Sequence, residues 1–514
     1  MFTLKKLKMK RYQTAVCGLC LLLICSSAAI PPTKTNRLYT SEYDNVLGTS
    51  LELKVSSASQ QSAEIAETAA MNEIDRLNKI LSGYDANSEF GKWSQTKNMA
   101  VKVSPELFEV LEMFDKWREQ SGGALDASAE TVGRVWKEAA KNNTHPTTAD
   151  LAAAVAMVKQ THWTLNKTEQ SATHLDDAPL MLNSFVKSYI MDRACNVALE
   201  TKGATGIVMN IGGDIVVKGA HTEQVQVSNP KADAENDLPI AKLLINDKTI
   251  ATSGNYRRGE LVNGIWHSHI VDPRTGLPAD NIISATVVAN NATDAGALAT
   301  AFNVLNPEES RKLAKTVPGA EYMIITSDGK RIESEGWKVL EIPEVKQVAT
   351  KSTFAADKAW DPAYELKINL ELAEIEGMRV HRPYVAVWVV DKDKKPVRDI
   401  ALWYNKPKYL NDMHYWYDAY YSSLMDVGSS VSSTTSATRP AGKYTLKWDG
   451  KDDKGTFVKK DTYTIMIEVA REHGTHQLIT QDLDFTKKIK PVSLPANTEV
   501  ASASLEYAKK TDDQ

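Results

Sequence analysis

The stretch ATGIVMNIGGDIVVKG, residues 204–219, is the segment from which the fold of the first half of the chain is best predicted. Apolar and β-branched residues on both sides of Gly212 and Gly213 indicate strands, because such side chains are enriched in strands and glycine interrupts them. Two interpretations of the glycine pair stay open. In the first, the pair forms a tight turn with Asp214 as its cap, and this interpretation is favoured when the pair is considered alone. In the second, its missing side chains let the backbone approach a ligand closely.

Strands and helices alternate on both sides of this stretch. Residues 63–81 place apolar side chains at helical spacing. Ser104 and Pro105 predict the cap and first residue of another helix, which ends at a Gly-Gly pair. Further strand patterns are TSLELKV, AKLLINDKTIATSG and ISATVVAN, at 49–55, 241–254 and 283–290. Residues 43–342 are therefore predicted to form an α+β domain of mixed strands and helices.

The pattern changes after Pro343. Residues 343–365 have little periodicity and indicate a linker. Short alternating strands such as RPYVAVWVVD and GKYTLKWDG then recur between turn clusters, which predicts an all-β sandwich of immunoglobulin size over residues 366–488. Residues 489–514 are predicted to be a flexible tail.

The N-terminus has the features of a secretory signal peptide. Lysines and an arginine precede the apolar run AVCGLCLLLIC, residues 15–25, and small residues follow at Ser27 and Ala29. Because the run is shorter than the roughly 20 residues of a membrane span, we expect cleavage near Ala29 and export to the periplasm. Only Cys195 then remains in the mature chain, and its helical surroundings favour a packed core thiol over a nucleophile.

The 514 residues carry a formal net charge of -4. This balance gives no bulk electrostatic reason to expect nucleic acid or an anionic membrane as a partner. Small molecules and proteins remain as partners, with membrane association only through those partners.

The stretch WHSHIVDPRTG, residues 266–276, carries candidate catalytic groups. His267, His269 and Asp272 precede a Pro-Arg-Thr-Gly turn, which would hold its neighbours rigidly. A histidine fixed there can act as a base near neutral pH, or it merely bonds the turn. Zinc is disfavoured, because two histidines two apart on a strand supply only two ligands.

The stretch TDAGALATAF, residues 293–302, predicts the start of a packed helix. Thr293 suits the cap, and Asp294 suits the positive end of the helix dipole. Thr300 is different, because its hydroxyl lies in an otherwise apolar helix and must bond either the backbone one turn earlier or something held against the helix.

Eight blocks in order make residues 43–342 similar to the ApbE-like FAD:protein FMN transferases. They include VLGTSLELKV, NSFVKSYIMDR, VMNIGGDIVVKG, HIVDPRTG and ATDAGALATAFNVL. The resemblance implies a magnesium-dependent enzyme that cleaves FAD and transfers FMN to a Ser or Thr hydroxyl of an acceptor protein, releasing AMP. It places His269 as the base, with Asp272 beside it as a catalytic residue. The FAD site implied by the same blocks consists of Leu47, Gly48, Thr49, Tyr84, Ala124, Leu125, Asp126, Asn183, Tyr189, Gly212 and Gly213.

The metal ligands of the family are matched only in part. The resemblance assigns the main-chain carbonyl of Val186 and the hydroxyl of Thr300 to Mg²⁺, but the family's aspartate position is Gly296. Asp294 can substitute only through a distorted first turn or a bridging water, since it lies about 120° around an ideal helix from Thr300. Losing the charged ligand should weaken the site. Ser188 stands where the family often has glycine, as does Ser184.

Residues 375–485 resemble uncharacterised periplasmic domains, and part of them resembles the Ig-like sandwich of flagellar hook-cap proteins. Within this region, SSTTSAT partly matches the acceptor pattern Asp-x-x-Ser/Thr-Gly-Ala-Ser/Thr at Thr435, Ala437 and Thr438, although ordinary loop composition also explains it.

Three functions follow as hypotheses. The first is an exported FMN transferase; the alternatives are a non-catalytic FAD-binding carrier or assembly protein, and a magnesium-dependent pyrophosphatase that yields FMN and AMP.

Overall fold

The computed structural model describes residues 36–255, 258–343, 359–375, 382–404, 410, 412–426, 435–436, 439, 441–471 and 474–510. The predicted signal peptide, most of the predicted linker, and Ala437 with Thr438 lie outside these residues. No helix of the described part is long and apolar enough to cross a membrane.

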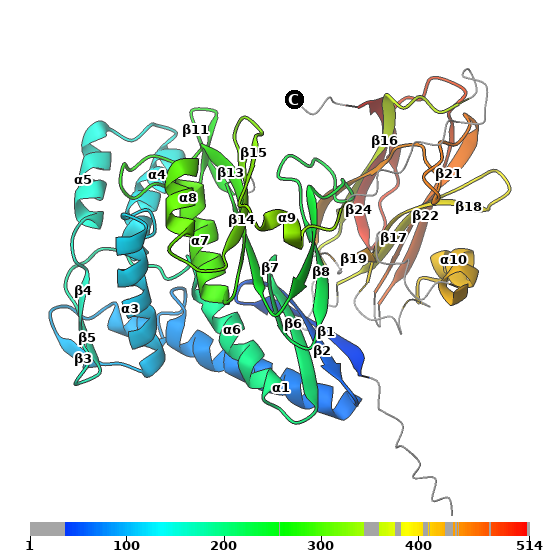
Figure 1. Cartoon of the computed structure of the whole chain (residues 1–514). Coiled ribbons are helices and arrows are strands. Elements are labelled where there is room, and N and C mark those ends of the chain that lie inside the picture. The colour runs from blue at the N-terminus through cyan, green and yellow to red at the C-terminus, as the bar shows by residue number, and fades with distance from the viewer. Residues whose placement is uncertain are drawn as a thin grey trace, which may run out of the picture. The chain divides into compact units, whose positions relative to one another are not determined.

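An eight-stranded sheet forms the centre of the first domain (Figure 1). Neighbouring strands run antiparallel throughout. In spatial order they are β1 Arg37–Val46, β2 Thr49–Ser57, β6 Ala204–Ile211, β7 Asp214–Gly219, β10 Thr249–Gly254, β13 Ile282–Ala289, β14 Glu321–Thr326 and β15 Arg331–Glu333. The sequence prediction of mixed strands and helices is confirmed.

Both faces of the sheet are covered. On one face, α1 Gln60–Leu81, α6 Val186–Leu199 and α7 Ala292–Val304 bury the main core, which includes Cys195. On the other face, the hairpin β8 Thr222–Val227 with β9 Ala241–Asn246 and the short α9 Trp337–Leu340 enclose a smaller core around Trp337. Because the central strands are buried on both faces, they are rich in Val and Ile on both sides.

The rest of this domain is mainly helical and holds several of the predicted site loops. α3 begins at Pro105 after Ser104, whose side chain accepts a hydrogen bond from the Leu107 N–H as predicted. The other elements are α2 Glu89–Trp93, α3 Pro105–Gln120, η1 Ala127–Ala129, α4 Glu130–Asn142, α5 Thr148–Val158, α8 Pro307–Ala314, the sheet of β3 Ala100–Lys102, β4 Trp163–Asn166 and β5 Ser171–His174, and the hairpin of β11 Gly259–Val262 and β12 Ile265–Ser268.

Two sheets form the C-terminal domain, as the sandwich prediction requires. One is β20 Gly442–Trp448, β16 Tyr364–Leu372, β24 Val500–Lys509 and β23 Val492–Leu494; the other is β19 Thr435–Ser436, β18 Pro396–Trp403, β17 Tyr384–Val390, β21 Thr462–Ala470 and β22 His476–Asp484. Their facing side chains bury a core that contains Trp360, Trp403 and Trp448.

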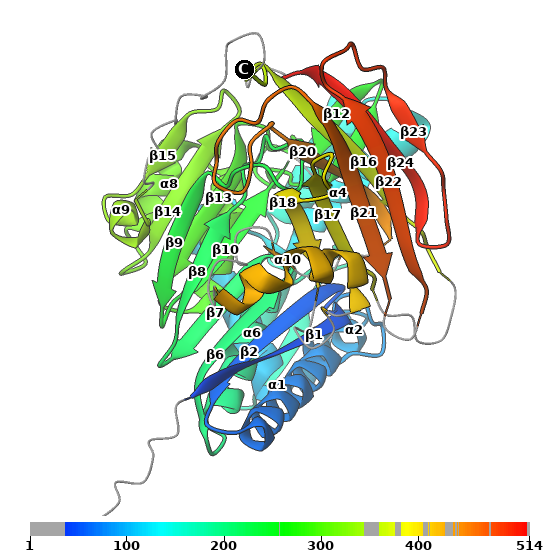
Figure 2. The same ribbon diagram turned by 90° about the vertical axis from the view of Figure 1, so that its right-hand side faces the viewer.

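Two predictions for this domain are wrong. The supposed tail contains β24, which lies between β16 and β23 in its sheet. The all-β prediction misses α10, His414–Asp426, which packs Trp416 and Tyr420 against the outer face of the five-stranded sheet (Figure 2). The aromatic side chains of this segment find a partner surface only in the folded sheet.

Candidate functional site

The glycine pair of the quoted stretch forms the two-residue turn between β6 and β7. Both residues have positive φ, 58° at Gly212 and 94° at Gly213, where an ordinary side chain is strained. The Gly212 N–H donates to the Ser50 carbonyl at 3.2 Å, and a Cβ on Gly212 would lie 2.8 Å from Thr49 Cγ2. A Cβ on Gly213 would meet nothing within 4 Å. The pair therefore forms the predicted tight turn, but its side-chain cap is Asn210 and not Asp214, since the Gly213 N–H donates to Asn210 Oδ1 at 3.1 Å. The turn lies directly against the predicted Leu47–Thr49 segment.

Asn183 and Tyr84 come together although 99 residues separate them. The Asn183 amide donates to the Tyr84 hydroxyl at 2.7 Å, and Tyr84 is 81% exposed. This ring is therefore free to cover a bound planar group. Tyr189 differs, because it is buried and its hydroxyl donates to Glu109 at 2.7 Å. Burial also raises the pKa of Tyr189, so its role here is packing and hydrogen bonding within the protein.

The start of α6 meets α7 at the position that the family resemblance assigns to a metal. Thr300 Oγ1 donates to the Ser184 carbonyl at 3.0 Å, so its hydroxyl bonds a segment held against the helix and not its own preceding turn. Val186 is the first residue of α6. At Gly296, an added Cβ would overlap Ser188 Oγ and lie 3.1 Å from Ser188 Cβ. The Ser188 side chain therefore occupies the space next to Gly296 into which an aspartate side chain would extend.

Asp214 is the nearest carboxylate with a contact to Ser188. Its Oδ2 lies 3.4 Å from Ser188 Oγ and 3.0 Å from Lys187 Nζ, and its Oδ1 accepts from the Thr252 N–H at 3.4 Å. Lys187 Nζ also donates to the Ile211 carbonyl, one residue before the glycine turn, at 3.1 Å. This ion pair fixes a cation beside that turn.

Asp294 is bonded to the residue that caps its own helix. The N-cap of α7 is Asn291 and not the predicted Thr293, because the Asn291 side chain accepts from the Asp294 N–H at 2.9 Å. Asn291 Nδ2 in turn donates to Asp294 Oδ2 at 2.7 Å. Asp294 is thus engaged in the first turn of its own helix. Within the described residues, no three His, Cys, Asp or Glu side chains are grouped so that they could hold a metal ion. The residues present do not fit the family's metal site.

His269 follows β12 and has one ring nitrogen committed. Its Nδ1 lies 2.9 Å from the Arg258 carbonyl, and its own N–H donates to the same oxygen at 3.2 Å. Since a carbonyl can only accept, Nδ1 must carry the proton, which leaves Nε2 of the neutral ring as a proton acceptor. Desolvation lowers the pKa of His269 below the ordinary value of a histidine. An oriented, uncharged imidazole is the form that can remove a proton from a hydroxyl group.

Asp272 is held by Arg274. Arg274 Nη2 and Nε lie 2.9 Å from Asp272 Oδ2 and Oδ1, and the Gly276 N–H donates to the Asp272 carbonyl at 2.8 Å. A Cβ on Gly123 would lie 3.6 Å from Arg274 Cγ, so the Ala124–Asp126 segment begins beside this turn. Asp126 is buried, with Oδ2 2.8 Å from Arg118 Nε. These carboxylates shape the turns, and neither bonds His269 directly.

His267 has a packing role. Its ring centroid lies 4.6 Å from that of Trp136 with the ring planes tilted by 40°, and its Nε2 is buried without a hydrogen-bond partner among the described residues. Two residues apart on the chain, His267 and His269 therefore differ in environment. His267, whose Nε2 has no polar partner among the described residues, is therefore a suitable control for His269, whose tautomer is fixed.

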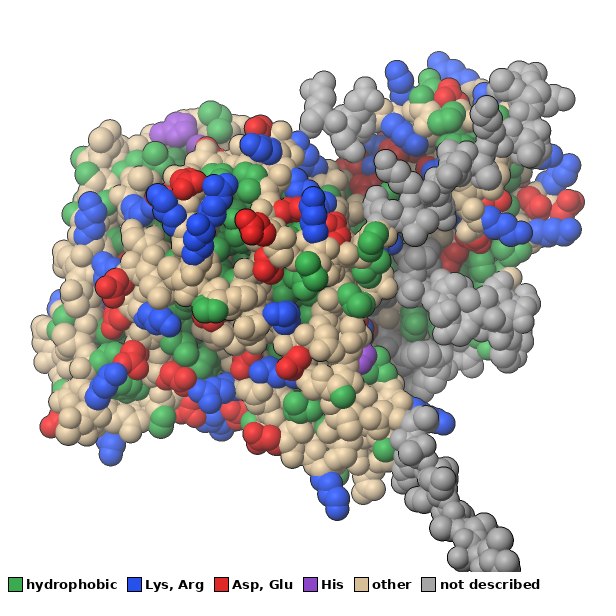
Figure 3. Space-filling view, in the orientation of Figure 1, with side chains coloured by type: hydrophobic (Ala, Val, Ile, Leu, Met, Phe, Trp, Pro, Cys, Tyr) green, Lys and Arg blue, Asp and Glu red, His purple; other side chains and the backbone are tan. Residues whose placement is uncertain are grey.

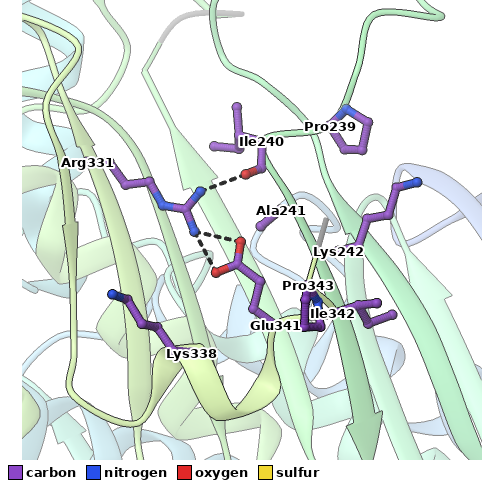
Figure 4. A pocket seen from close by; sticks show the side chains of 9 residues that line it. All are labelled: Pro239, Ile240, Ala241, Lys242, Arg331, Lys338, Glu341, Ile342 and Pro343. Atoms are coloured by element: carbon purple, nitrogen blue, oxygen red, sulfur yellow. Dashed lines mark hydrogen bonds and ion pairs between the residues drawn. The ribbon is translucent and has the colours of Figure 1, made fainter. Parts of the chain in front are cut away.

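Figure 3 shows Lys and Arg interspersed with Asp and Glu on the face in view. A separate pocket is lined by residues of β9, β15 and α9 and shares no residue with the predicted site (Figure 4). Arg331 in this pocket is paired with Glu341 at 2.8 Å and donates to the Ile240 carbonyl, so its charge is already matched.

Comparison with known proteins finds family matches in two parts of the chain. The ApbE family model matches residues 47–324, and a model described as a predicted periplasmic protein (DUF2271) matches residues 365–502. The first match spans more than half of the chain, and the chain belongs to the ApbE family.

Several relatives of this family carry a named activity. The FAD:protein FMN transferase of Klebsiella pneumoniae (strain 342) is 25% identical over 346 residues, covering 65% of this chain and 96% of that protein. The protein of the same name from Vibrio cholerae (strain O395) is 28% identical over 284 residues, covering 52% and 83%.

Solved structures show the same fold. The ApbE protein of Thermotoga maritima has a TM-score of 0.53 at 27% identity, covering 60% of this chain and all of that chain. The apo flavinyl transferase ApbE of Pseudomonas stutzeri has a TM-score of 0.50 at 18% identity over a similar share, which supports the fold.

Sequence reasoning missed three contributions to this site. Lys187 and Asp214 lie inside quoted blocks, but only their pairing across 27 residues shows that they fix a charge at the glycine turn. The Arg258 carbonyl, which orients His269, is a backbone group. No residue-type signal could have identified it.

Proposed function

We propose that this chain is a FAD:protein FMN transferase. It binds FAD, and the oxygen of a Ser or Thr hydroxyl on an acceptor protein forms a bond to the phosphorus that carries the riboflavin. The bond from that phosphorus to the bridging oxygen breaks, and AMP leaves with the electron pair. Family membership and the names of the relatives support this reaction class.

The observation that carries the proposal is the orientation of His269. With Nδ1–H donated to the Arg258 carbonyl, Nε2 is available to take the proton of the attacking hydroxyl. The lowered pKa of His269 favours the neutral form of the ring. In this role His269 is the catalytic base, and Asp272 acts only by holding the following turn through Arg274.

We assign the FAD site to the segments that the resemblance names, of which Leu47–Thr49 lies against the glycine turn. Leu47–Thr49 and Gly212–Gly213 supply backbone that a phosphate can approach closely, since no side chain projects from Gly213. Tyr84, held by Asn183, supplies an exposed ring for the flavin. Ala124–Asp126, which follow Gly123 beside Arg274, are included in the site on the basis of the resemblance.

The resemblance also implies Mg²⁺, through Val186, Thr300 and an aspartate. The aspartate position is Gly296, Thr300 is bonded to Ser184, and Asp294 is bonded to Asn291. This ligand set does not fit the ion, and no step of the reaction is assigned to it.

We further propose export to the periplasm after cleavage near Ala29, with the C-terminal sandwich positioning a protein partner. The leader sequence supports export, and the DUF2271 description of the second domain agrees with it. The acceptor is a protein with a Ser/Thr flavinylation sequence.

The test is an incubation of the purified chain with FAD and a protein domain that carries Asp-x-x-Ser/Thr-Gly-Ala-Ser/Thr. We expect a covalently fluorescent acceptor and AMP from the unchanged chain and from His267→Ala, and no labelling from His269→Ala, which should still bind FAD. Labelling by His269→Ala would remove this residue from its role. Free FMN without labelled acceptor would instead identify a pyrophosphatase, and bound intact FAD with no products would identify a carrier.

A further inference from the structure

We propose that the FAD site of this chain works without a divalent cation, because the Ser188 hydroxyl occupies the position where the family carries its metal-binding carboxylate. The inference rests on the FAD site of the proposed function. It concerns the requirement for a metal ion, in which this chain departs from its family.

The first observation is the packing of α6 against α7. A Cβ at Gly296 would overlap Ser188 Oγ, lie 3.1 Å from Ser188 Cβ and lie 3.6 Å from Phe185 Cα. Rotating the serine side chain moves Oγ but leaves Cβ in place. An aspartate at 296 is therefore overpacked while residue 188 is serine, because Ser188 must rotate its hydroxyl and move its Cβ by a few tenths of an ångström.

The second observation is that the two departures compensate each other. Where the family has aspartate, this chain has Gly296, and where the family often has glycine, it has Ser188. Both positions are buried, and they face each other across α6 and α7. The volume and the oxygen lost at 296 are supplied from 188, but the negative charge is not. A neutral hydroxyl is a much weaker ligand for Mg²⁺ than a carboxylate.

The third observation is that the other candidate ligands are engaged. Thr300 Oγ1 donates to the Ser184 carbonyl, and the Asp294 carboxylate accepts from Asn291. The Asp214 carboxylate is paired with Lys187 at 3.0 Å. A cation placed here would have to displace the lysine ammonium from the only carboxylate that contacts Ser188 in the described part of the chain.

Positive charge for the diphosphate of FAD is available without a metal ion. Lys187 Nζ is anchored to the Ile211 carbonyl beside the glycine turn, and its side chain remains 31% exposed. α6 begins at Val186, and its N-cap Phe185 provides no side-chain hydrogen bond. The Val186 N–H donates to the Leu182 carbonyl at 3.3 Å, and the helix dipole favours an anion at this end. Lys187 is also paired with Asp214 at 3.0 Å, so it can neutralise the diphosphate only in part, by sharing its ammonium group between the two anions.

The experiment measures FAD binding to the full chain by isothermal titration calorimetry, once with EDTA and once with saturating Mg²⁺. We expect the two dissociation constants to agree within about twofold. Tightening of tenfold or more by Mg²⁺, equivalent to about 1.4 kcal/mol, would overturn the inference while leaving the proposed function intact. Absence of FAD binding under both conditions would overturn the proposed function and this inference with it.

Manganese provides a second readout that does not depend on FAD. Electron paramagnetic resonance of added Mn²⁺ should show only the free ion with the unchanged chain, and with Gly296→Asp alone. The double variant Ser188→Gly with Gly296→Asp should bind Mn²⁺ and should make FAD binding depend on Mg²⁺, whereas Ser188→Gly alone should do neither. Bound Mn²⁺ in the unchanged chain would contradict the proposal, as would a folded double variant that binds none.

Discussion

Gly296 and Ser188 should be energetically coupled through packing alone, which can be tested without any ligand. Glycine to alanine inside a helix normally stabilises by about 1 kcal/mol. At Gly296 the new Cβ would overlap Ser188 Oγ and sit 3.1 Å from Ser188 Cβ, and overpacking of this kind costs about 1–3 kcal/mol. We therefore expect Gly296→Ala to destabilise the first domain by about 1 kcal/mol on balance.

Removing the Ser188 side chain should reverse the sign of the stability change caused by Gly296→Ala. In a Ser188→Gly background, Gly296→Ala should stabilise by up to about 1 kcal/mol, so the coupling energy of the double-mutant cycle is about 2 kcal/mol. Gly133→Ala is a matched control, because Gly133 lies within α4 and its Cβ would meet only Glu130 Oε2 at an ordinary 3.4 Å. This control should stabilise the domain.

Differential scanning calorimetry is the suitable assay, because two domains with separate cores are not expected to unfold in one step. For a domain of this size, 1 kcal/mol corresponds to about 2 °C in Tm. The reasoning fails if the two substitutions are additive within about 0.5 kcal/mol. It also fails if Gly296→Ala raises Tm as much as Gly133→Ala does.

Three further predictions concern binding and catalysis. The acidic limb of the pH profile for transfer should have its midpoint below pH 6.5, because the lowered pKa of His269 keeps the base neutral to lower pH; a midpoint above 7 in initial-rate measurements would contradict this. Lys187→Met should weaken FAD binding about tenfold in calorimetry, equally with EDTA and with Mg²⁺, and an unchanged affinity would remove Lys187 from the diphosphate site. Deleting residues 345–514 should leave FAD binding intact, since the predicted site residues all lie before residue 343; a folded truncation that loses binding would show that the sandwich contributes to the pocket.

Local signals in the sequence predicted much of the first domain. Ser104 and Pro105 gave the correct helix start, and the alternation in residues 49–55 gave a correct strand. The start of α7 was predicted two residues late, because Asn291 and Thr293 are both good caps and only the packing of the chain selects between them.

The errors in the second domain have a common physical cause. β24 is composed largely of small and polar residues, and its place in the sheet comes from backbone pairing with β16 and β23. α10 is rich in aromatic residues, and its helix is stabilised by packing on the sheet formed by β17 and β18. In both segments tertiary contacts outweigh local preference, which a single sequence does not reveal.

For the site, the sequence identified the departure at Gly296 but not its consequence. The sequence alone suggests that restoring aspartate at 296 would strengthen a weak metal site. The contact with Ser188, 108 positions earlier in the chain, shows that a second substitution is needed. Such compensation between distant segments becomes visible only when α6 and α7 are packed together.

The most direct test of the central claim is the intact mass of an acceptor domain after incubation with the chain and FAD. The account predicts an acceptor heavier by one FMN on a Ser or Thr, an equal amount of AMP, and neither product with His269→Ala. An unmodified acceptor and no AMP, from a chain shown to bind FAD, would contradict it.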